Sequence, residues 1–340
     1  MKNLSFLLIF YLSFLASHAS TGGMEFSYNN LRYEIIDNSS VSIKGYVFEP
    51  SGELNIPSSV TYNSNSYSVI RIGDEAFIRC TGITGVVMPS TVTKIGFNAF
   101  CDCNGLRRVS IPNSVTYIGE GAFGRCYGLS DIEIPNRVTF IGNNAFLDCS
   151  ALSRANLPNT LTYIGEGAFA RTGLTSVIIP NSISVINVNA FASCSNLRKA
   201  IIPNSVTKLE LNAFCDCSGL TDITIPNSVI FIGDGAFGRC YGLTRVDIPN
   251  SVTYIGNNAF LDCSGLNWVH LSESLTYIGQ GAFARTGLTS LTIPNSVTHI
   301  SPLGFLDCPR LRYVRMPERF IDEAGIIFGN CANIDFDLTY

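Results

Sequence analysis

Charge is scarce in this 340-residue sequence, in which Asp, Glu, Lys and Arg together make up 14% and hydrophobic residues 46%. The 22 basic and 26 acidic side chains give a formal net charge of −4. Nucleic-acid binding is disfavoured because it needs clustered Lys and Arg. The charges are too scattered for a polybasic membrane contact, so Ser, Thr and Asn must provide most of the solvation.

Residues that usually carry catalysis are also few. Beyond the N-terminal stretch only two histidines remain, His270 and His299, and no metalloprotease, phosphate-loop, Gly-x-Ser-x-Gly or paired-Cys zinc motif occurs. Asp131 and Glu133 have the spacing of two solvated positions on one face of a strand, which explains them better than a glycosidase pair does. Cys101-x-Cys103 has no further metal ligands nearby. We therefore expect no enzyme, no cofactor and no metal.

The one long apolar stretch lies at the N-terminus. Lys2, the apolar run Leu4 to Ala16 and the small-x-small sequence Ser17-His18-Ala19 predict a signal peptide over residues 1–19. A membrane anchor is the alternative, but the run is shorter than the roughly 20 apolar residues of a spanning helix. We expect an exported protein, secreted or on the cell surface, with no transmembrane segment in the mature chain.

A repeat dominates the rest of the chain. Phenylalanine, most often as Ala-Phe, recurs every 23 residues, except for two intervals of 22 that end at Phe191 and Phe305. The repeated positions are Phe77, Phe100, Phe123, Phe146, Phe169, Phe191, Phe214, Phe237, Phe260, Phe283, Phe305 and Phe328.

Each unit has the same internal order, as the segment from Phe100 to Phe123 shows. A cysteine follows the Phe, then Leu-x-x-Val-x-Ile over residues 106–111, then Pro-Asn, a second short apolar stretch over 115–118, and a glycine. The alternating Val and Ile predict a strand, and Pro-Asn ends it because proline has no N–H for a ladder. One unit cannot bury its apolar face alone, so the units must stack as coils of a solenoid.

The repeat Leu-x-x-Val-x-Ile-Pro-Asn-x-Val-x-x-Ile-Gly-x-x-Ala-Phe resembles the BspA-like leucine-rich-repeat surface proteins, including the related treponemal 23-residue repeats. The resemblance covers roughly residue 70 to the C-terminus, in more than ten copies. It implies a mainly β solenoid arc of about eleven to twelve coils. It also implies non-catalytic extracellular binding, in several members to host or matrix proteins.

Residues 20–69 do not fit the repeat. Their alternating segments around Phe26, Tyr33 and Val41 predict a β-rich cap over the first coil. The solenoid is then expected over residues 70–340, with an irregular last coil in which residues 334–338 form a closing strand.

Ten of the twelve cysteines lie three residues after a repeat Phe and form one column. Stacked, parallel side chains do not meet the geometry of a disulfide, so we expect free thiols that act as small buried hydrophobes. Thr172 and Thr286 fill this column in the two short coils. Cys101 and Cys215 fall outside it and are the better candidates for reactivity.

The array contains an internal duplication, because residues 100–176 match residues 214–290 at an offset of 114. Loop segments such as residues 122–129 are identical in both copies, whereas the nine outward strand positions in three pairs of coils all differ. Either exposed sites drifted, or the concave sheet, the usual binding surface of such folds, diversified for a ligand.

The concave sheet is therefore the candidate ligand-binding surface, with Trp268, the only tryptophan, at its centre. Aromatic and Arg side chains are frequent anchors at interfaces. The candidate residues are Trp268, His270, Arg312, Tyr313, Arg315, Arg245, Asp247, Arg107, Arg108, Asp131, Glu133 and Arg154. The predicted partner is an extracellular protein, from the host or its matrix, recognised by an adhesion scaffold.

A second column, on the expected convex side, holds Tyr117, Phe140, Tyr163, Phe231, Tyr254 and Tyr277, interrupted by Val185 and Lys208. Its rings would lie within stacking range of one another. Ring stacking that stiffens the solenoid is one interpretation. The alternatives are a self-assembling structural surface protein or a carbohydrate-binding module that uses this column.

Overall fold

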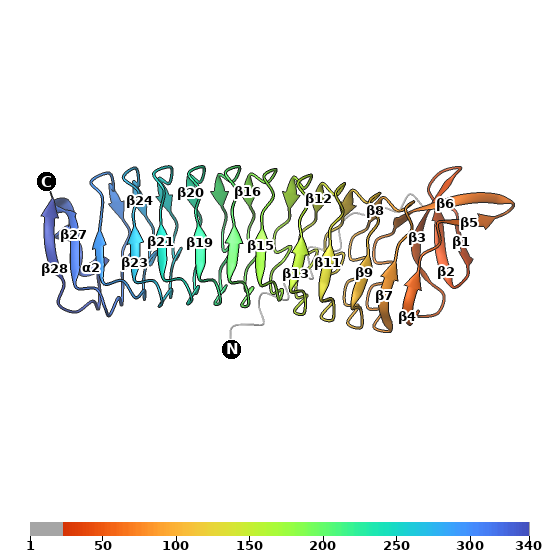
Figure 1. Cartoon of the computed structure of the whole chain (residues 1–340), viewed down its shortest axis with the longest axis horizontal. Coiled ribbons are helices and arrows are strands. Elements are labelled where there is room, and N and C mark those ends of the chain that lie inside the picture. Colours follow the sequence, from red (N-terminus) through yellow and green to blue (C-terminus); the bar gives the residue numbers. More distant parts are fainter. Residues whose placement is uncertain (1–22, 340) are drawn as a thin grey trace.

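The computed structural model describes residues 23–339, so the predicted signal peptide lies outside the described residues. The chain forms an elongated β-solenoid of about twelve coils (Figure 1). Within the described range, no helix combines the length and apolar character needed to cross a membrane.

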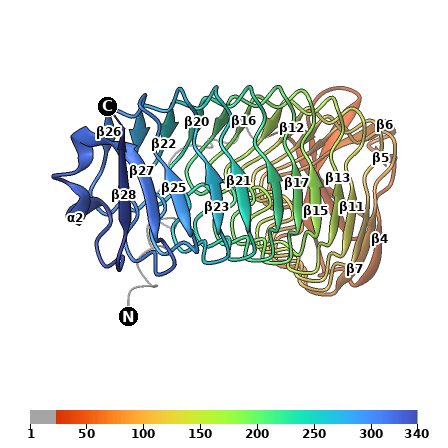
Figure 2. The same cartoon turned by 60° about the vertical axis from the view of Figure 1, so that its left-hand side comes forward.

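Most coils contribute one longer strand and one two-residue strand, and each kind forms its own row of parallel strands along the rod (Figure 2). The longer strands pair in five separate sheets and the two-residue strands in two. The longer strands are β4 (Gly52–Asn55), β7 (Ile83–Val87), β9 (Arg108–Ser110), β11 (Asp131–Glu133), β13 (Arg154–Asn156), β15 (Ser176–Ile178), β17 (Lys199–Ile201), β19 (Asp222–Thr224), β21 (Arg245–Asp247), β23 (Trp268–His270), β25 (Ser290–Thr292), β27 (Tyr313–Pro317) and β28 (Asp335–Thr339). The two-residue strands are β8 (Lys94–Ile95), β10 (Tyr117–Ile118), β12 (Phe140–Ile141), β14 (Tyr163–Ile164), β16 (Val185–Ile186), β18 (Lys208–Leu209), β20 (Phe231–Ile232), β22 (Tyr254–Ile255), β24 (Tyr277–Ile278) and β26 (His299–Ile300).

The N-terminal part joins the solenoid through a shared strand. It contains β1 (Glu25–Tyr28), β2 (Leu31–Ile35), β3 (Ser40–Tyr46), β5 (Ser59–Tyr62) and β6 (Asn65–Ile72). Strand β6 pairs with β3 and β5 on the N-terminal side and with β8 of the first regular coil. The boundary proposed at residue 69 therefore falls inside a strand. At the other end, η1 (Glu318–Phe320) and α2 (Ala324–Ile327) precede β28, the closing strand that the sequence predicts.

The repeat phenylalanines form the centre of the core. Consecutive rings from Phe77 to Phe328 stack with centroids 5.1–5.7 Å apart, and those up to Phe305 are fully buried. The backbone is bonded in the same register, since the Phe100 N–H donates to the Ala122 carbonyl one coil later at 2.8 Å. Because removing a buried Phe side chain typically costs about 3–5 kcal/mol, this Phe column is the main support of the stack.

The cysteine column consists of free thiols, as expected, but its role is not only apolar. Nine of its members donate the thiol hydrogen to the carbonyl of a Phe in the preceding coil; Cys103 Sγ lies 3.0 Å from the Phe77 oxygen, and Cys263 Sγ 3.1 Å from that of Phe237. Where the column holds Thr172, the hydroxyl binds the Phe169 carbonyl of its own coil at 2.8 Å. The column therefore satisfies buried carbonyls between coils.

A charged column runs along the turns, two residues after each Phe. Arginine and aspartate alternate there from Arg79 to Arg171 and again from Asp216 to Asp307, and every member has a positive φ of 54–62°. Each Arg forms an ion pair with an Asp in a neighbouring coil, for example Arg171 with Asp148 at 2.9 Å. Left-handed backbone is costly for such residues, and these pairs offset part of that cost.

In most coils a glycine three residues before Ala-Phe lets consecutive coils approach closely, while Asn187 and Glu210 hold this position in two coils. A Cβ added at Gly142 would lie 2.4 Å from the Glu120 nitrogen. We expect Gly142→Ala to lower the free energy of unfolding by about 1–3 kcal/mol, because backbone must shift to admit the methyl group. The urea midpoint measures the effect. The control is Gly325→Ala in α2, where nothing lies within 4 Å of the added Cβ; equal midpoints for the two variants would contradict this account.

Because the thiols are buried, we expect the free energy of unfolding to fall at alkaline pH. Burial raises the pKa of Cys149 and of Cys263 to about 12, from a usual value of 9.0. The unfolded chain releases these protons above about pH 9 while the folded protein keeps them. Their contribution is therefore complete below pH 9 and is lost as the pH rises towards 12. We expect the urea midpoint to fall between pH 8.5 and 10.5, and to fall less steeply in Cys149→Ala; an identical pH dependence in wild type and variant would argue against the thiols as its source.

Candidate functional site

The strand face is the outward surface of the longer strands, and it holds all twelve predicted site residues. Ten of them lie within β9, β11, β13, β21, β23 and β27, while Arg107 and Arg312 directly precede β9 and β27. All are exposed except Trp268, which is half-buried. Strand alternation explains the arrangement, because the intervening Val, Ile or Ala side chain points into the core.

Trp268 lies within a compact cluster on β21 and β23. The Arg245 guanidinium lies over its ring, with the guanidinium carbon 3.5 Å from the ring centroid. Two residues further along the same strand pair, Asp247 lies opposite His270, and His270 Nδ1 is 2.9 Å from an Asp247 carboxylate oxygen. The four side chains hold one another in place, so the indole is presented in a fixed orientation, with a cation–π contact on one side.

Tyr313 and Arg315 form a second cluster with Asp337, which is not among the predicted site residues. The Tyr313 hydroxyl donates to an Asp337 oxygen at 2.7 Å, and Arg315 Nε lies 3.6 Å from the same carboxylate. This hydrogen bond raises the pKa of the Tyr313 hydroxyl. Arg312 is engaged differently, since its Nη1 donates to three main-chain carbonyls, those of Pro309, Leu311 and Ala332.

The remaining predicted residues lie at the N-terminal end of the strand face, several coils from Trp268. Arg108 binds the Glu53 carboxylate through two nitrogens, and Arg154 pairs with Asp131 at 3.3 Å. Arg107 and Glu133 have no side-chain ion pair within residues 23–339. The candidate residues therefore form two separate groups, one at each end of the rod.

Sequence reasoning missed three exposed aliphatic side chains on the strand face, Val87, Ile178 and Ile201. Their exposure could have been predicted from the repeat, since each occupies the last outward position of its strand. In Val177-Ile178-Ile179, for example, the middle residue points outward between two buried ones.

The identical loops of the two duplicated blocks have a structural explanation. Arg125 and Asp148, which are retained in the second block as Arg239 and Asp262, belong to the alternating charged column described above. Their retention follows from coil stacking. The contrast between constant loops and a varied strand face is therefore not by itself a sign of ligand binding.

The aromatic column stacks as predicted. Tyr117, Phe140 and Tyr163 are 4.8 and 4.9 Å apart, and the second run, from Phe231 through Tyr254 and Tyr277, continues to His299 at spacings of 4.7–5.0 Å. The rings are nearly parallel, with interplanar angles of 3–16°. They cover one another's faces and leave mainly their edges to solvent.

The two cysteines outside the main column are held near the charged turns. Cys101 and Cys215 lie 3.9 and 3.8 Å from the guanidinium nitrogens of Arg125 and Arg239. Burial nevertheless raises the pKa of both thiols, that of Cys215 to about 11, so neither has the lowered pKa of a reactive cysteine. A depression of about 510 Å³ lies beside Cys215. Within residues 23–339, no group of three or more His, Cys, Asp or Glu side chains has a metal-binding arrangement.

Comparison with known proteins identifies the fold and the family. The family described as BspA type leucine rich repeat region, in six copies, matches residues 70–198 and 184–312. Members of this family are typically non-catalytic binding scaffolds. No curated protein matches the chain.

Among solved structures, a leucine-rich cell surface protein from Faecalibacterium prausnitzii is similar over 94% of this chain and 97% of its own. It shows 26% identity and a TM-score of 0.57. The pneumococcal vaccine antigen PcpA is similar over 86% of this chain and 82% of its own, with 19% identity and a TM-score of 0.63, which supports the fold alone. The chain therefore belongs to the family of BspA-type leucine-rich-repeat proteins.

Proposed function

We propose that the protein is an exported adhesion or binding scaffold that recognises a protein ligand on its strand face. The Trp268 cluster is the observation that carries this proposal. A half-buried indole held by Arg245 resembles the pre-organised aromatic and arginine anchors that dominate interface energies. The family of protein-interaction scaffolds and the cell-surface relative from Faecalibacterium support the same assignment.

The C-terminal half of the strand face has the form of a binding surface with two anchors. The Trp268 cluster and the Tyr313 cluster lie on β23 and β27, and β25 between them presents only Ser290 and Thr292. Small side chains between two larger groups leave room for a ligand to contact both. The spacing of two strands is about 9–10 Å, which a single protein loop or helix spans.

Carbohydrate binding through the aromatic column is a weaker alternative. Sugar rings bind aromatic residues by stacking on an open ring face, and here the interior ring faces are covered by neighbouring rings. The column is better explained as a stack that stiffens the solenoid. Self-assembly through this surface is tested by sedimentation at high concentration, where a persistent monomer would count against it.

The binding proposal predicts that Trp268→Ala loses the ligand without loss of the fold. Purified extracellular-matrix and serum proteins are captured on immobilised wild type, and each captured partner is titrated against the variants. Loss of an anchoring Trp commonly costs 2 kcal/mol or more, so we expect at least about 30-fold weaker binding.

Tyr241→Ala is the matched control, because Tyr241 is aromatic and exposed but lies in the turn before β21, outside the strand face. Wild type and this control should bind equally. A partner that binds Trp268→Ala as tightly as Tyr241→Ala would remove the Trp268 cluster from the site.

A further inference from the structure

The last outward residue of each longer strand forms a line along the rod, here called the third column. In order it contains Val87, Ser110, Glu133, Asn156, Ile178, Ile201, Thr224, Asp247, His270, Thr292 and Arg315. Where the strands pair, they do so in register, and neighbours in this column lie one strand spacing apart, about 4.8 Å. Strands β9 and β11, β13 and β15, β19 and β21, and β23 and β25 are adjacent along the rod without strand pairing.

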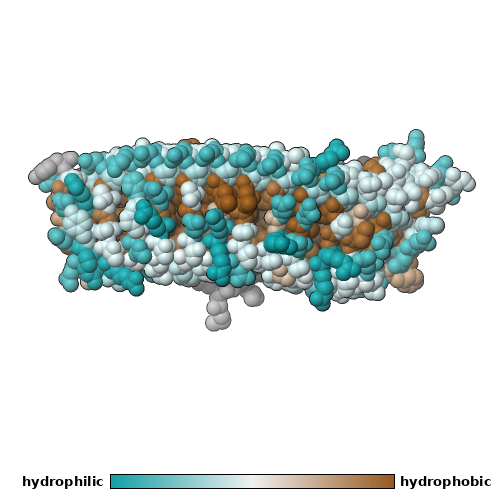
Figure 3. Space-filling view, in the orientation of Figure 1, coloured by the Kyte–Doolittle hydropathy of each residue, from teal (hydrophilic) through white to brown (hydrophobic). Residues whose placement is uncertain are grey.

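Aliphatic residues occupy three places in this column, in two separate patches. Val87 is 39% exposed, Ile178 65% and Ile201 44%. The last two are paired directly across β15 and β17. Figure 3 shows the two patches as separate hydrophobic areas on this face, with hydrophilic side chains between them. Solvent-exposed aliphatic groups at positions that elsewhere hold Ser, Thr, Asn or charged residues indicate a surface that is covered in use.

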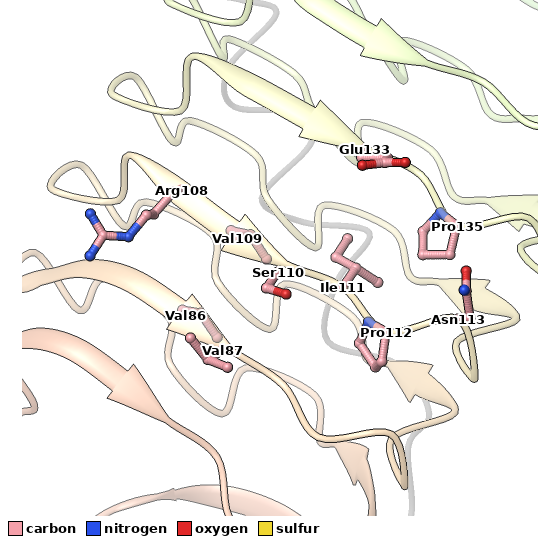
Figure 4. Close-up of a pocket in the computed structure, with 10 residues that line it drawn as sticks. All are labelled: Val86, Val87, Arg108, Val109, Ser110, Ile111, Pro112, Asn113, Glu133 and Pro135. Atoms are coloured by element: carbon pink, nitrogen blue, oxygen red, sulfur yellow. The ribbon is translucent and has the colours of Figure 1, made fainter.

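The first patch lies in a depression of about 630 Å³ formed by β7, β9 and β11. Exposed Val87 and half-buried Val109 and Ile111 line it, together with Val86, which is itself buried. Figure 4 shows the aliphatic side chains on two neighbouring strands, with Arg108 at one end and Glu133 on the next strand. An aliphatic or aromatic side chain of a partner fits this depression.

The charge between the two patches is negative and uncompensated. Glu133 lies midway between Val87 and Ile178, and no hydrogen bond or ion pair of its side chain is formed within residues 23–339. Its charged neighbours Arg108 and Arg154 are already paired with Glu53 and Asp131.

Other unpaired charges lie in a different column. Arg107 and Arg198 occupy the first outward position of their coils, directly before β9 and β17, and form no side-chain ion pair among the described residues. The third column thus offers apolar, acidic and apolar contacts in order, and a partner's complementary surface is apolar, basic and apolar.

We propose that Val87, Glu133 and Ile178 form a docking line for an amphipathic helix of a protein partner, lying along the rod axis. This deepens the binding function proposed above and rests on it. The line from Val87 to Ile178 crosses four coil-to-coil steps, ~19 Å at one strand spacing for each step, which a helix covers in about 13 residues at 1.5 Å each. Side chains near i, i+7 and i+14 share one helix face, so two apolar residues with a basic residue between them match the line.

An extended segment does not meet the same condition. It covers ~19 Å in about six residues, and its middle residue, three positions from either end, points to the opposite side of the strand. The basic group would then face away from Glu133. Ile201, one coil beyond Ile178, gives the helix a further apolar contact at its next turn.

The test uses a displayed library of helical 21-residue peptides with one face randomised, selected on the full-length protein. We expect selected peptides to carry a basic residue between two apolar ones about two heptads apart. Their binding should weaken at least 10-fold on Ile178→Ser and on Glu133→Gln. Selection on Glu133→Lys should yield an acidic residue at the middle position.

Ile230→Ser is the matched control, because Ile230 is 48% exposed but lies off the strand face. Peptides that show no basic preference, or that bind Ile178→Ser as tightly as Ile230→Ser, would overturn the proposal. Self-association that disappears in Ile178→Ser would also overturn it by assigning the surface to a second copy.

Trp268→Ala separates this inference from the general function. The selected peptides should bind this variant normally, since Trp268 lies four coils beyond Ile178. Loss of matrix-protein capture in Trp268→Ala, together with peptides indifferent to Ile178 and Glu133, would leave the binding function intact and remove the helix-docking line.

Discussion

In-register stacking of identical positions is the constraint on which the whole molecule depends. A single coil has almost no interior, and its Phe, Leu and Ile side chains are buried only when the next coil supplies matching residues one strand spacing away. The backbone ties the coils at the same register, as in the bonds from Phe100 to Ala122 and from Phe123 to Ala145. The residue type at each position of a column must therefore be compatible with the side chains one coil before and one coil after it.

This constraint fixes most of the surface as well as the core. The turns carry alternating Arg and Asp because each side chain meets its column neighbours, and the aromatic column stacks for the same reason. The thiols of Cys126 and Cys149 bind carbonyls of preceding coils. The strand face is different, because its outward residues are spaced by the ladder but are not needed to hold it. It is the surface on which sequence can change at the lowest cost in stability, and so the natural place for recognition.

The period alone made the solenoid, the Phe and thiol columns and the stacked rings predictable, because all of them follow from one unit repeated in register. Pairings between different residue types were not predictable in the same way. The contacts of Arg245 with Trp268 and of Tyr313 with Asp337 depend on side-chain direction as well as on column membership. The thiol-to-carbonyl bonds were missed because Cys was treated as purely apolar. The exposure of Ile178 and Ile201 was harder to predict because the buried positions beside them are also aliphatic, so that only the strand alternation, and not the residue type, distinguishes them.

The hydrophobic patch at Ile178 and Ile201 lies at the joint between the two duplicated blocks. The Arg–Asp alternation has a period of two coils, whereas the duplicated blocks are offset by five, an odd number. The two blocks can only be joined by a slip in the alternation, and it occurs at Ser193, between Arg171 and Asp216. An Asp at this position would lie beside Asp216, and like charges in adjacent strands repel. The neutral Ser avoids this repulsion.

The pairing of the two-residue strands is also interrupted at this joint, between β14 and β16. Strands β15 and β17 thus lie at the joint between the blocks, where two neighbouring coils present aliphatic side chains to solvent in direct register, an arrangement found at no other pair of longer strands in residues 23–339.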